Sequence, residues 1–450
     1  MITIGHSLPN KKVANKVGFK SIDEVVNDEQ GPIEYHGDAH LLTIAPTGAG
    51  KGRSNIIPTC LTYTGSLILL DPKGEAAQVT AKAREKFGPV YIIDPFKIVT
   101  QNPDKFNPLE TALPGLPVEQ EGMMLAKAIQ GNTSSLASDP YWDNKSTELL
   151  SALFINELCN GKSIKNIRQS LMSDDVDYNI AVMMDNNKEL NKYAYELFGS
   201  YLQTPSEKTR PCILSTAQQH LSLLGDPAVL ESLDGPTSFS IQDLLDGKPM
   251  TIYFVIPPNK IYAFSNLLRL WVISLINLLS NRKHKPEQPT LMLLDECGNL
   301  GEMQSLVTAV TLLRSYGLQI WMFFQDLGQM KQLYPKQWTT LFNNSEIVMA
   351  YGIRNMMMAK EVAETLGGGT PFEILSMHTS HGLACLSGRE PFKIKLLDYM
   401  TDKEFKDSGF RKNSFYEKKP DLKNDLKPNK PIKRVKRKGG KSNNQNPEKD

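Results

Sequence analysis

The chain has 450 residues and a formal net charge of +2, and hydrophobic residues make up 40% of the sequence. This length can bury a large core and predicts two to three domains in a soluble globular protein. The five cysteines share no C-x-x-C spacing, which excludes a cysteine-rich metal site or a disulfide framework and indicates reduced thiols in the cytoplasm. We expect no signal peptide and no membrane span, because the most apolar stretch, 261–279, is interrupted by polar residues.

A phosphate-binding loop is predicted after 38 weakly patterned residues, which we expect to wrap the edge of the core. Apolar residues 41–44 predict a buried parallel strand. The segment Ala45–Lys51 (APTGAGK) is then close to the pattern G-x-x-x-x-G-K-[ST], in which backbone N–H groups surround phosphate oxygens. The predicted nucleotide-binding residues are Thr47, Gly48, Ala49, Gly50, Lys51 and Gly52.

Two positions depart from this pattern. Ala45 stands in place of the first glycine, and Gly52 stands in place of the Ser or Thr whose hydroxyl holds magnesium. We therefore expect the phosphate cradle to be intact, whereas the replacement for the missing magnesium ligand stays open between Ser54 and a water molecule.

The next segments alternate as in a doubly wound parallel sheet. Strands are predicted at 66–70 and 90–93 with a helix between them, and a short helix at 53–63 is expected to kink at Pro58. The first of these strands runs into the polar turn Asp-Pro-Lys-Gly-Glu at 71–75. Such a turn lies at the sheet edge where α/β proteins bind their ligands.

Helical patterns fill the middle of the chain, at 149–158 and 193–202. We expect a nucleotide-binding domain in two parts, 1–113 and 209–410, an all-α insertion at 114–208, and a basic disordered tail at 411–450. The tail contains a run of lysine and arginine residues at 433–438. This run either binds nucleic acid or anionic lipid, or it only keeps the chain soluble.

The second half of the chain predicts the acidic side of the same site. Strand 290–294 ends in Asp295 and Glu296, of which the first would lie near a metal and the second would orient an attacking water. Strand 319–324 ends at Gln325, whose amide is placed to sense a terminal phosphate. Further strands are predicted at 251–256, 345–351 and 392–397, and further helices at 261–279, 304–316 and 359–366.

Together these pieces resemble the coupling proteins of type IV secretion and conjugation, the TraG/TraD-type ATPases. The resemblance covers about residues 40–365 and rests on five stretches in order: APTGAGKG followed by IIPT, SLILLDPKGE, VYIIDPF followed by FNPL, LMLLDECGNLG, and LLRSYGLQIWMFFQDLGQM. Glycine at the position of Gly52 is similar to what many members of this family carry. The resemblance implies an α/β fold, a RecA-like P-loop NTPase with a mainly parallel sheet and an inserted all-α domain.

The resemblance also implies roles for individual residues. Carried over by position, Lys51 binds phosphate, Asp295 holds Mg²⁺, Glu296 activates water and Gln325 senses the γ-phosphate of ATP. Arg314 matches the candidate arginine finger of the family, which would reach the nucleotide of the neighbouring subunit and stabilise transition-state charge.

The implied function is ATP-driven recruitment and translocation of a DNA–protein relaxosome, or of an effector substrate, to a type IV secretion or conjugation channel. Its implied partners are single-stranded DNA, relaxase or effector proteins, channel components and further copies in a homo-hexamer. Family members typically start with membrane-spanning helices. Because none is expected here, we expect a cytoplasmic protein with at most an indirect, peripheral position at the inner face of the membrane. Two alternatives stay open: a substrate-receptor module with a slow or structural nucleotide site, and another RecA-like DNA pump.

Overall fold

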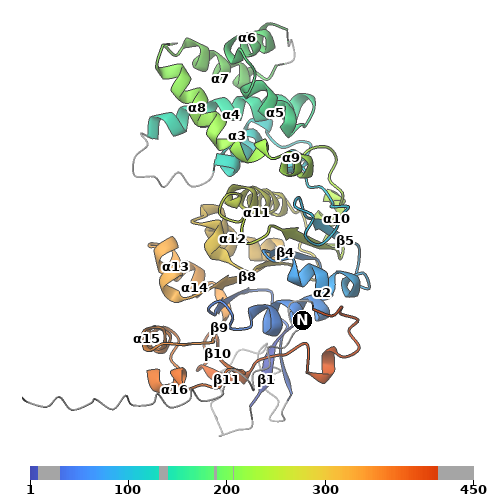
Figure 1. The fold of residues 1–450 in the computed structure, drawn as a ribbon, viewed down its shortest axis with the longest axis vertical. Coiled ribbons are helices and arrows are strands. Elements are labelled where there is room, and N and C mark those ends of the chain that lie inside the picture. Colours follow the sequence, from blue (N-terminus) through green and yellow to red (C-terminus); the bar gives the residue numbers. More distant parts are fainter. Residues whose placement is uncertain (9–30, 131–139, 187–189, 206, 414–450) are drawn as a thin grey trace, which may run out of the picture. The chain divides into compact units, whose positions relative to one another are not determined.

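An eleven-stranded sheet runs through the centre of the described chain (Figure 1). The computed structural model describes residues 1–8, 31–130, 140–186, 190–205 and 207–413. The strand order is β2-β1-β11-β10-β9-β3-β8-β7-β4-β6-β5. The strands are β1 (Ile2–Ser7), β2 (Pro32–Tyr35), β3 (His40–Ile44), β4 (Leu67–Asp71), β5 (Val90–Ile93), β6 (Thr251–Val255), β7 (Thr290–Leu294), β8 (Leu318–Phe324), β9 (Ser345–Tyr351), β10 (His381–Leu386) and β11 (Phe392–Lys395).

Seven of these strands, from β9 to β5 in the sheet order, pair in parallel. The other four form an antiparallel extension at the β9 edge. The predicted α/β fold with a mainly parallel sheet is therefore confirmed. The extension contains β1, β2 and β10, which the sequence pattern did not predict. The weakly patterned N-terminal segment thus supplies two edge strands.

Helices cover both faces of the sheet (Figure 1). The α-helices of the described residues are α1 (Ile57–Thr62), α2 (Glu75–Arg84), α3 (Val118–Gln130), α4 (Pro140–Asn160), α5 (Ile164–Leu171), α6 (Val176–Asn186), α7 (Lys192–Gln203), α8 (Thr209–His220), α9 (Pro227–Leu233), α10 (Ile241–Leu245), α11 (Ser265–Ser280), α12 (Gln304–Leu312), α13 (Leu327–Leu333), α14 (Trp338–Asn343), α15 (Met356–Thr365) and α16 (Pro371–Leu375). Adjacent residues of one strand point to opposite faces, so Leu42 belongs to the hydrophobic cluster that contains α11 and α12, while Leu41 belongs to the cluster that contains α1 and α2. Most residues of the parallel strands are apolar because both faces of this part of the sheet are covered.

Two helices differ from the prediction near prolines. A π-helical turn, Gly52–Ile56, precedes α1, and its wider turn accommodates the ring of Pro58, so the helical segment runs on through this proline. The predicted helix at 261–279 begins only at Ser265. Residues 258–264 form turns instead, directly after the consecutive prolines at 257 and 258.

The segment between β5 and β6 is helical, and no strand interrupts it among its described residues. Helix α4 packs against α3, α7 and α8, and α3 also packs against α11 beside the sheet. The side chains of Ser163, Asn191 and Asp226 cap α5, α7 and α9. An all-α region is therefore present, while its boundaries at 114 and 208 stay predictions. The predicted basic tail lies outside the described residues from 414 onward.

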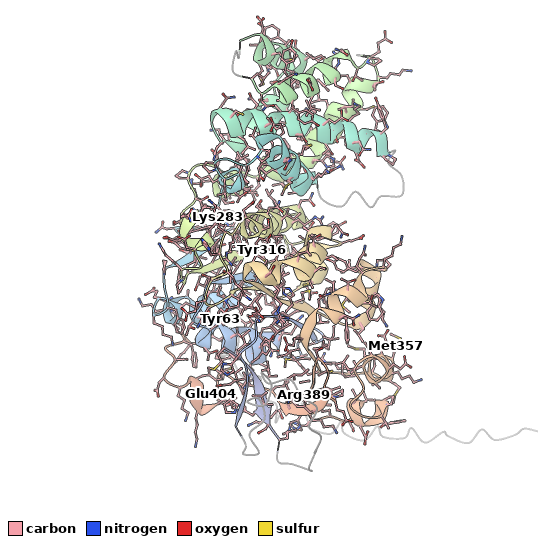
Figure 2. The ribbon with its side chains drawn as sticks, turned by 180° about the vertical axis from the view of Figure 1, so that it is seen from behind. Tyr63, Lys283, Tyr316, Met357, Arg389 and Glu404 are labelled. Atoms are coloured by element: carbon pink, nitrogen blue, oxygen red, sulfur yellow. The ribbon has the colours of Figure 1, made fainter. Side chains whose placement is uncertain are left out.

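Buried polar groups fix the end of α1 against the sheet. Tyr63 lies inside the molecule (Figure 2), and its hydroxyl donates to the carbonyl of Pro289 at 2.5 Å. The fully buried Arg84 donates to Thr251 Oγ1 at 2.8 Å, to Gly65 O at 3.0 Å and to Tyr63 O. These bonds satisfy carbonyls that would otherwise be buried without a partner. Within the described part of the chain, no helix is both long and apolar enough to cross a membrane.

Candidate nucleotide site

The predicted phosphate-binding loop connects β3 to the π-helical turn at Gly52. Gly48 and Gly50 have φ angles of +75° and +96°, a region that L side chains rarely adopt. The loop packs closely against the residue that follows β9, because a Cβ atom added to Gly352 would lie 2.4 Å from the Cβ of Ala49. Glycines at these positions therefore give the loop its curvature and its close contact with β9.

Lys51, Glu296 and Gln325 meet at the carboxyl edge of the sheet. Strand β8 lies between β3 and β7, so these three residues follow three neighbouring strands. Lys51 Nζ lies 3.3 Å from Glu296 Oε2, and Gln325 Nε2 donates to the same oxygen at 3.0 Å. The Lys51 and Glu296 side chains are only 11% and 13% exposed, so solvent screens this ion pair weakly. The structure thus brings together residues that are 245 positions apart in the chain.

Gln329 is a further member of this cluster that the sequence analysis missed. Its Nε2 donates to Glu296 Oε1 at 3.3 Å, and its Oε1 accepts from the backbone N–H of Gln325 at 2.9 Å. Both Glu296 oxygens are therefore held by amide donors. Gln329 lies in the first turn of α13, whereas Gln325 precedes the N-cap residue Asp326, so no helical spacing in the sequence marks the pair.

Two acidic side chains lie beside this cluster. Burial raises the pKa of Asp295 to about 6, an effect that the nearby Lys51 ammonium opposes. Burial likewise raises the pKa of Asp71 to about 7, against the hydrogen bond from the Ala77 backbone N–H, and the two carboxyl groups repel each other electrostatically. Asp71 ends β4 in the Asp-Pro-Lys-Gly-Glu turn, and the sequence analysis gave it no role.

The charges around Asp295 fit a divalent cation. Its carboxyl group interacts electrostatically with Glu296 and Glu75 as well as with Asp71, and with the ammonium groups of Lys51 and Lys73. Carboxylate oxygens are the ligands that Mg²⁺ prefers, but among the described residues these four carboxyl groups do not form a group of three or more with their oxygens close together. The pattern position of the missing hydroxyl, Gly52, also faces acid, because a Cβ atom there would be 4.0 Å from the Glu75 carboxylate oxygens. Ser54, one of the two replacements that the sequence analysis left open, is buried, with 6% of its surface exposed.

Arg314 lies away from this cluster. It is in the 3₁₀ turn Leu313–Tyr316 before β8, at the opposite end of the strand from Gln325. Its guanidinium is 54% exposed and lies 2.8 Å from Asp38 Oδ1. Its distance from the site of its own chain and its exposure are compatible with a role in a neighbouring subunit, which stays a prediction.

A cavity of about 120 Å³ lies on the other side of the loop, next to β9. Gly48 and Ala49 line it together with Arg354, Met377 and His378. Arg354 Nη2 would be 3.4 Å from a Cβ atom on Gly48. No sequence signal marked Arg354, because it becomes a neighbour of the loop only through the pairing of β9 with β3.

The fold and this cluster define a P-loop NTPase: a parallel sheet with a glycine loop after one strand and a carboxylate pair after a nearby one. Residues 9–371 match the family described as Type IV secretory system Conjugative DNA transfer. Since this match covers most of the chain, the protein belongs to that family, as the resemblance predicted.

Curated relatives support the same assignment. The type IV secretion system-coupling protein VirD4 of Bartonella henselae is 25% identical over 371 residues, which are 79% of this chain and 56% of VirD4. The conjugal transfer protein TraG of Agrobacterium fabrum is 28% identical over 308 residues, which are 66% of this chain and 46% of TraG. The chain therefore spans about half the length of the curated relatives it matches.

Solved structures of the plasmid coupling protein TrwB share the fold. A bacterial conjugative coupling protein TrwB structure with sulphate has a TM-score of 0.64 and 17% identity, covering 80% of this chain and 85% of TrwB. TrwB in complex with ADP and Mg²⁺ has a TM-score of 0.62 at 16% identity, with the same coverage of 80% and 85%. The RecA-like fold with a helical region is thereby confirmed for this chain.

Proposed function

We propose that this chain is the ATP-hydrolysing part of a coupling protein. In this role it recruits a DNA–protein relaxosome or an effector substrate and translocates it to a type IV secretion or conjugation channel. Family membership and the names of the VirD4 and TraG relatives support this function. The observation that carries the hydrolytic part is the convergence of Lys51, Glu296 and Gln325 within 3.3 Å at one sheet edge.

The proposed chemistry depends on the ion pair between Lys51 and Glu296 and on the amide groups that donate to Glu296. In the chain alone, Lys51 pairs with Glu296. Bound triphosphate attracts the Lys51 ammonium, which frees a Glu296 oxygen to accept a proton from a water molecule. Gln325 and Gln329 keep the Glu296 carboxylate oriented through their amide N–H groups. Asp295, with Asp71 or Glu75 nearby, would hold Mg²⁺, which would supply positive charge against the phosphate oxygens.

The proposed assembly is a homo-hexamer in which Arg314 of one subunit reaches the nucleotide of the next. The proposed location is the cytoplasm, with attachment at the inner face of the membrane through partner proteins. Single-stranded DNA, a relaxase or effector protein and channel components are the proposed partners. A receptor module with a slow nucleotide site would bind ATP without measurable turnover, whether or not DNA is present.

The test is the rate of phosphate release from ATP by the native chain and by Lys51→Ala and Glu296→Gln. We expect turnover to fall by about 100-fold or more in both variants, because the first loses phosphate neutralisation and the second loses the base. Lys82→Ala is the matched control, since Lys82 is 59% exposed and its ion-pair partner among the described residues is the exposed Glu85. Full turnover in both site variants, with folding checked by circular dichroism, would remove the site assignment.

A further inference from the structure

Tyr262 is almost completely exposed. Its side chain is 97% accessible, the highest value among the large hydrophobic residues of the described chain. It lies in the turns between β6 and α11, where Lys260 N–H donates to Pro257 O at 2.9 Å and Phe264 N–H donates to Lys260 O at 3.0 Å. The ring is thus presented to solvent by an ordered, hydrogen-bonded segment. Single exposed aromatic residues are common on protein surfaces, so the neighbours of Tyr262 decide whether it marks a binding site.

The loop after β5 packs beside this segment. Strand β6 lies between β4 and β5, so the loops that follow these three strands are neighbours at the carboxyl edge. The Phe96 and Phe264 rings are 5.1 Å apart, and Lys260 Nζ lies 3.8 Å from the centre of the Phe96 ring. The exposed Lys97 and Ile98 follow Phe96 directly. The two loops therefore form one surface.

The turn after β4 contacts the same surface through Gly74. Gly74 has a φ of +67°, and a Cβ atom there would lie 2.6 Å from Val99 Cγ2 in the loop after β5. This contact brings the exposed Lys73 of the Asp-Pro-Lys-Gly-Glu turn to the same edge. We call Lys73, Lys97, Ile98, Lys260 and Tyr262 the strand-end surface.

The loops after β5 and β6 are basic, whereas the turn that carries Lys73 also contains Asp71 and Glu75. Segments 95–100 and 257–264 contain no acidic residue. Asp94, which precedes the first segment, is buried and accepts hydrogen bonds from the backbone N–H groups of Val99 and Thr100 at 2.6 and 3.2 Å. None of the three lysines has an ion-pair partner in the described part of the chain.

We propose that the strand-end surface binds single-stranded nucleic acid, with Tyr262 stacking on a base and Lys97 and Lys260 facing phosphates. An aromatic ring flanked by unpaired lysines is the arrangement that holds single strands without reading their sequence, because every base has a π-face. An anionic protein segment would use the lysines but would leave the ring uncovered. The inference rests on the proposed function and adds to it the place where a translocated strand is held.

The position of this surface connects strand binding to the nucleotide site. Lys73 and Glu75 both interact electrostatically with Asp295, and they flank Gly74, which contacts the loop carrying Lys97. One short turn therefore touches the acidic cluster on one side and the strand-end surface on the other.

The test is the affinity of the full chain for a fluorescein-labelled oligothymidylate, measured by fluorescence anisotropy across a salt series. Tyr262→Ala should weaken binding by about 10-fold or more and Tyr262→Phe should not, because phenylalanine keeps the stacking face. Lys97→Gln and Lys260→Gln should each make the slope of log affinity against log salt shallower by about 0.7. Tyr178→Ala is the matched control, since Tyr178 is 65% exposed but follows Asp177 on α6.

Two further measurements on each variant separate the explanations. Phosphate release without DNA tests the proposed function alone: native turnover with unchanged DNA affinity in Tyr262→Ala would overturn only the surface assignment. If Tyr262→Ala loses DNA affinity and the native chain releases no phosphate from ATP, the surface assignment is upheld and the proposed ATPase activity is refuted. The assembly mass is the second measurement, and a variant that loses the assembly together with DNA affinity would assign Tyr262 to contacts between copies and refute the proposal.

Discussion

Replacing Gly298 with alanine is expected to displace the water-orienting carboxylate while leaving the fold intact. A Cβ atom at this position would lie 2.2 Å from Gln329 Nε2 and 2.8 Å from Glu296 Oε1. Gly298 does not have a positive φ, so the substitution adds overlap without backbone strain. Both crowded groups are ends of flexible side chains, so they can move apart by about 1 Å. A misplacement of that size at a reacting centre costs about 100-fold in rate.

The assay is steady-state phosphate release, with kcat and KM determined separately, next to urea unfolding. We expect kcat to fall about 100-fold and the free energy of unfolding to change by less than about 1 kcal/mol. Gly225→Ala is the matched control, because no atom lies within 4 Å of a Cβ there and its φ is not positive. An unchanged kcat in Gly298→Ala would refute the idea that Gln329 and Glu296 act as one unit. A loss of stability above about 2 kcal/mol would attribute the effect to folding instead.

Three more predictions concern pH, assembly and stability. Burial raises the pKa of Asp71 to about 7, so the folded chain binds more protons than the unfolded chain between about pH 4 and about pH 7. Its free energy of unfolding in EDTA should therefore fall as pH rises through that window, and urea titrations of Asp71→Asn should show a flatter dependence. Arg314→Ala should lower kcat of the assembled protein by about 1,000-fold, whereas Asp38→Asn, which removes the nearer of the two carboxylates beside Arg314, should retain turnover in the same assay. Arg84→Met should destabilise the chain by at least about 3 kcal/mol in urea unfolding, because buried carbonyls lose their donor.

Continuous apolar runs explain why much of the parallel sheet could be predicted. Strands β5 and β7 were predicted with the bounds they have, 90–93 and 290–294, because each is a short apolar run that ends in acid. The same runs predicted which residues follow the strands at the carboxyl edge of the sheet. The contact between Lys51 and Glu296 additionally depends on β8 pairing with both β3 and β7, which no local pattern specifies.

The antiparallel extension could not be predicted for a related reason. Strand β10 has the sequence HGLACL, in which glycine and a polar first residue weaken the strand pattern. It becomes a strand because β9 offers an open edge, where Gly382 pairs with Tyr351 and Leu386 pairs with Ile347. Likewise, the start of α11 depends on turns after two prolines, and the apolar pattern of the helix itself contains no sign of them. Partners in space, more than local propensity, decided these elements.

Gly52 shows how a motif that fails in one segment can be completed by another. A Cβ atom added to Gly52 would lie 4.0 Å from its nearest neighbouring atoms, so a serine would fit there and steric hindrance does not explain the glycine. Those nearest atoms are the carboxylate oxygens of Glu75, and the buried Asp71 lies four residues earlier in the same turn. Carboxylates are at least as good magnesium ligands as a hydroxyl. We therefore infer that the turn after β4 supplies the oxygen that the loop lacks, a substitution that a pattern confined to the loop cannot register.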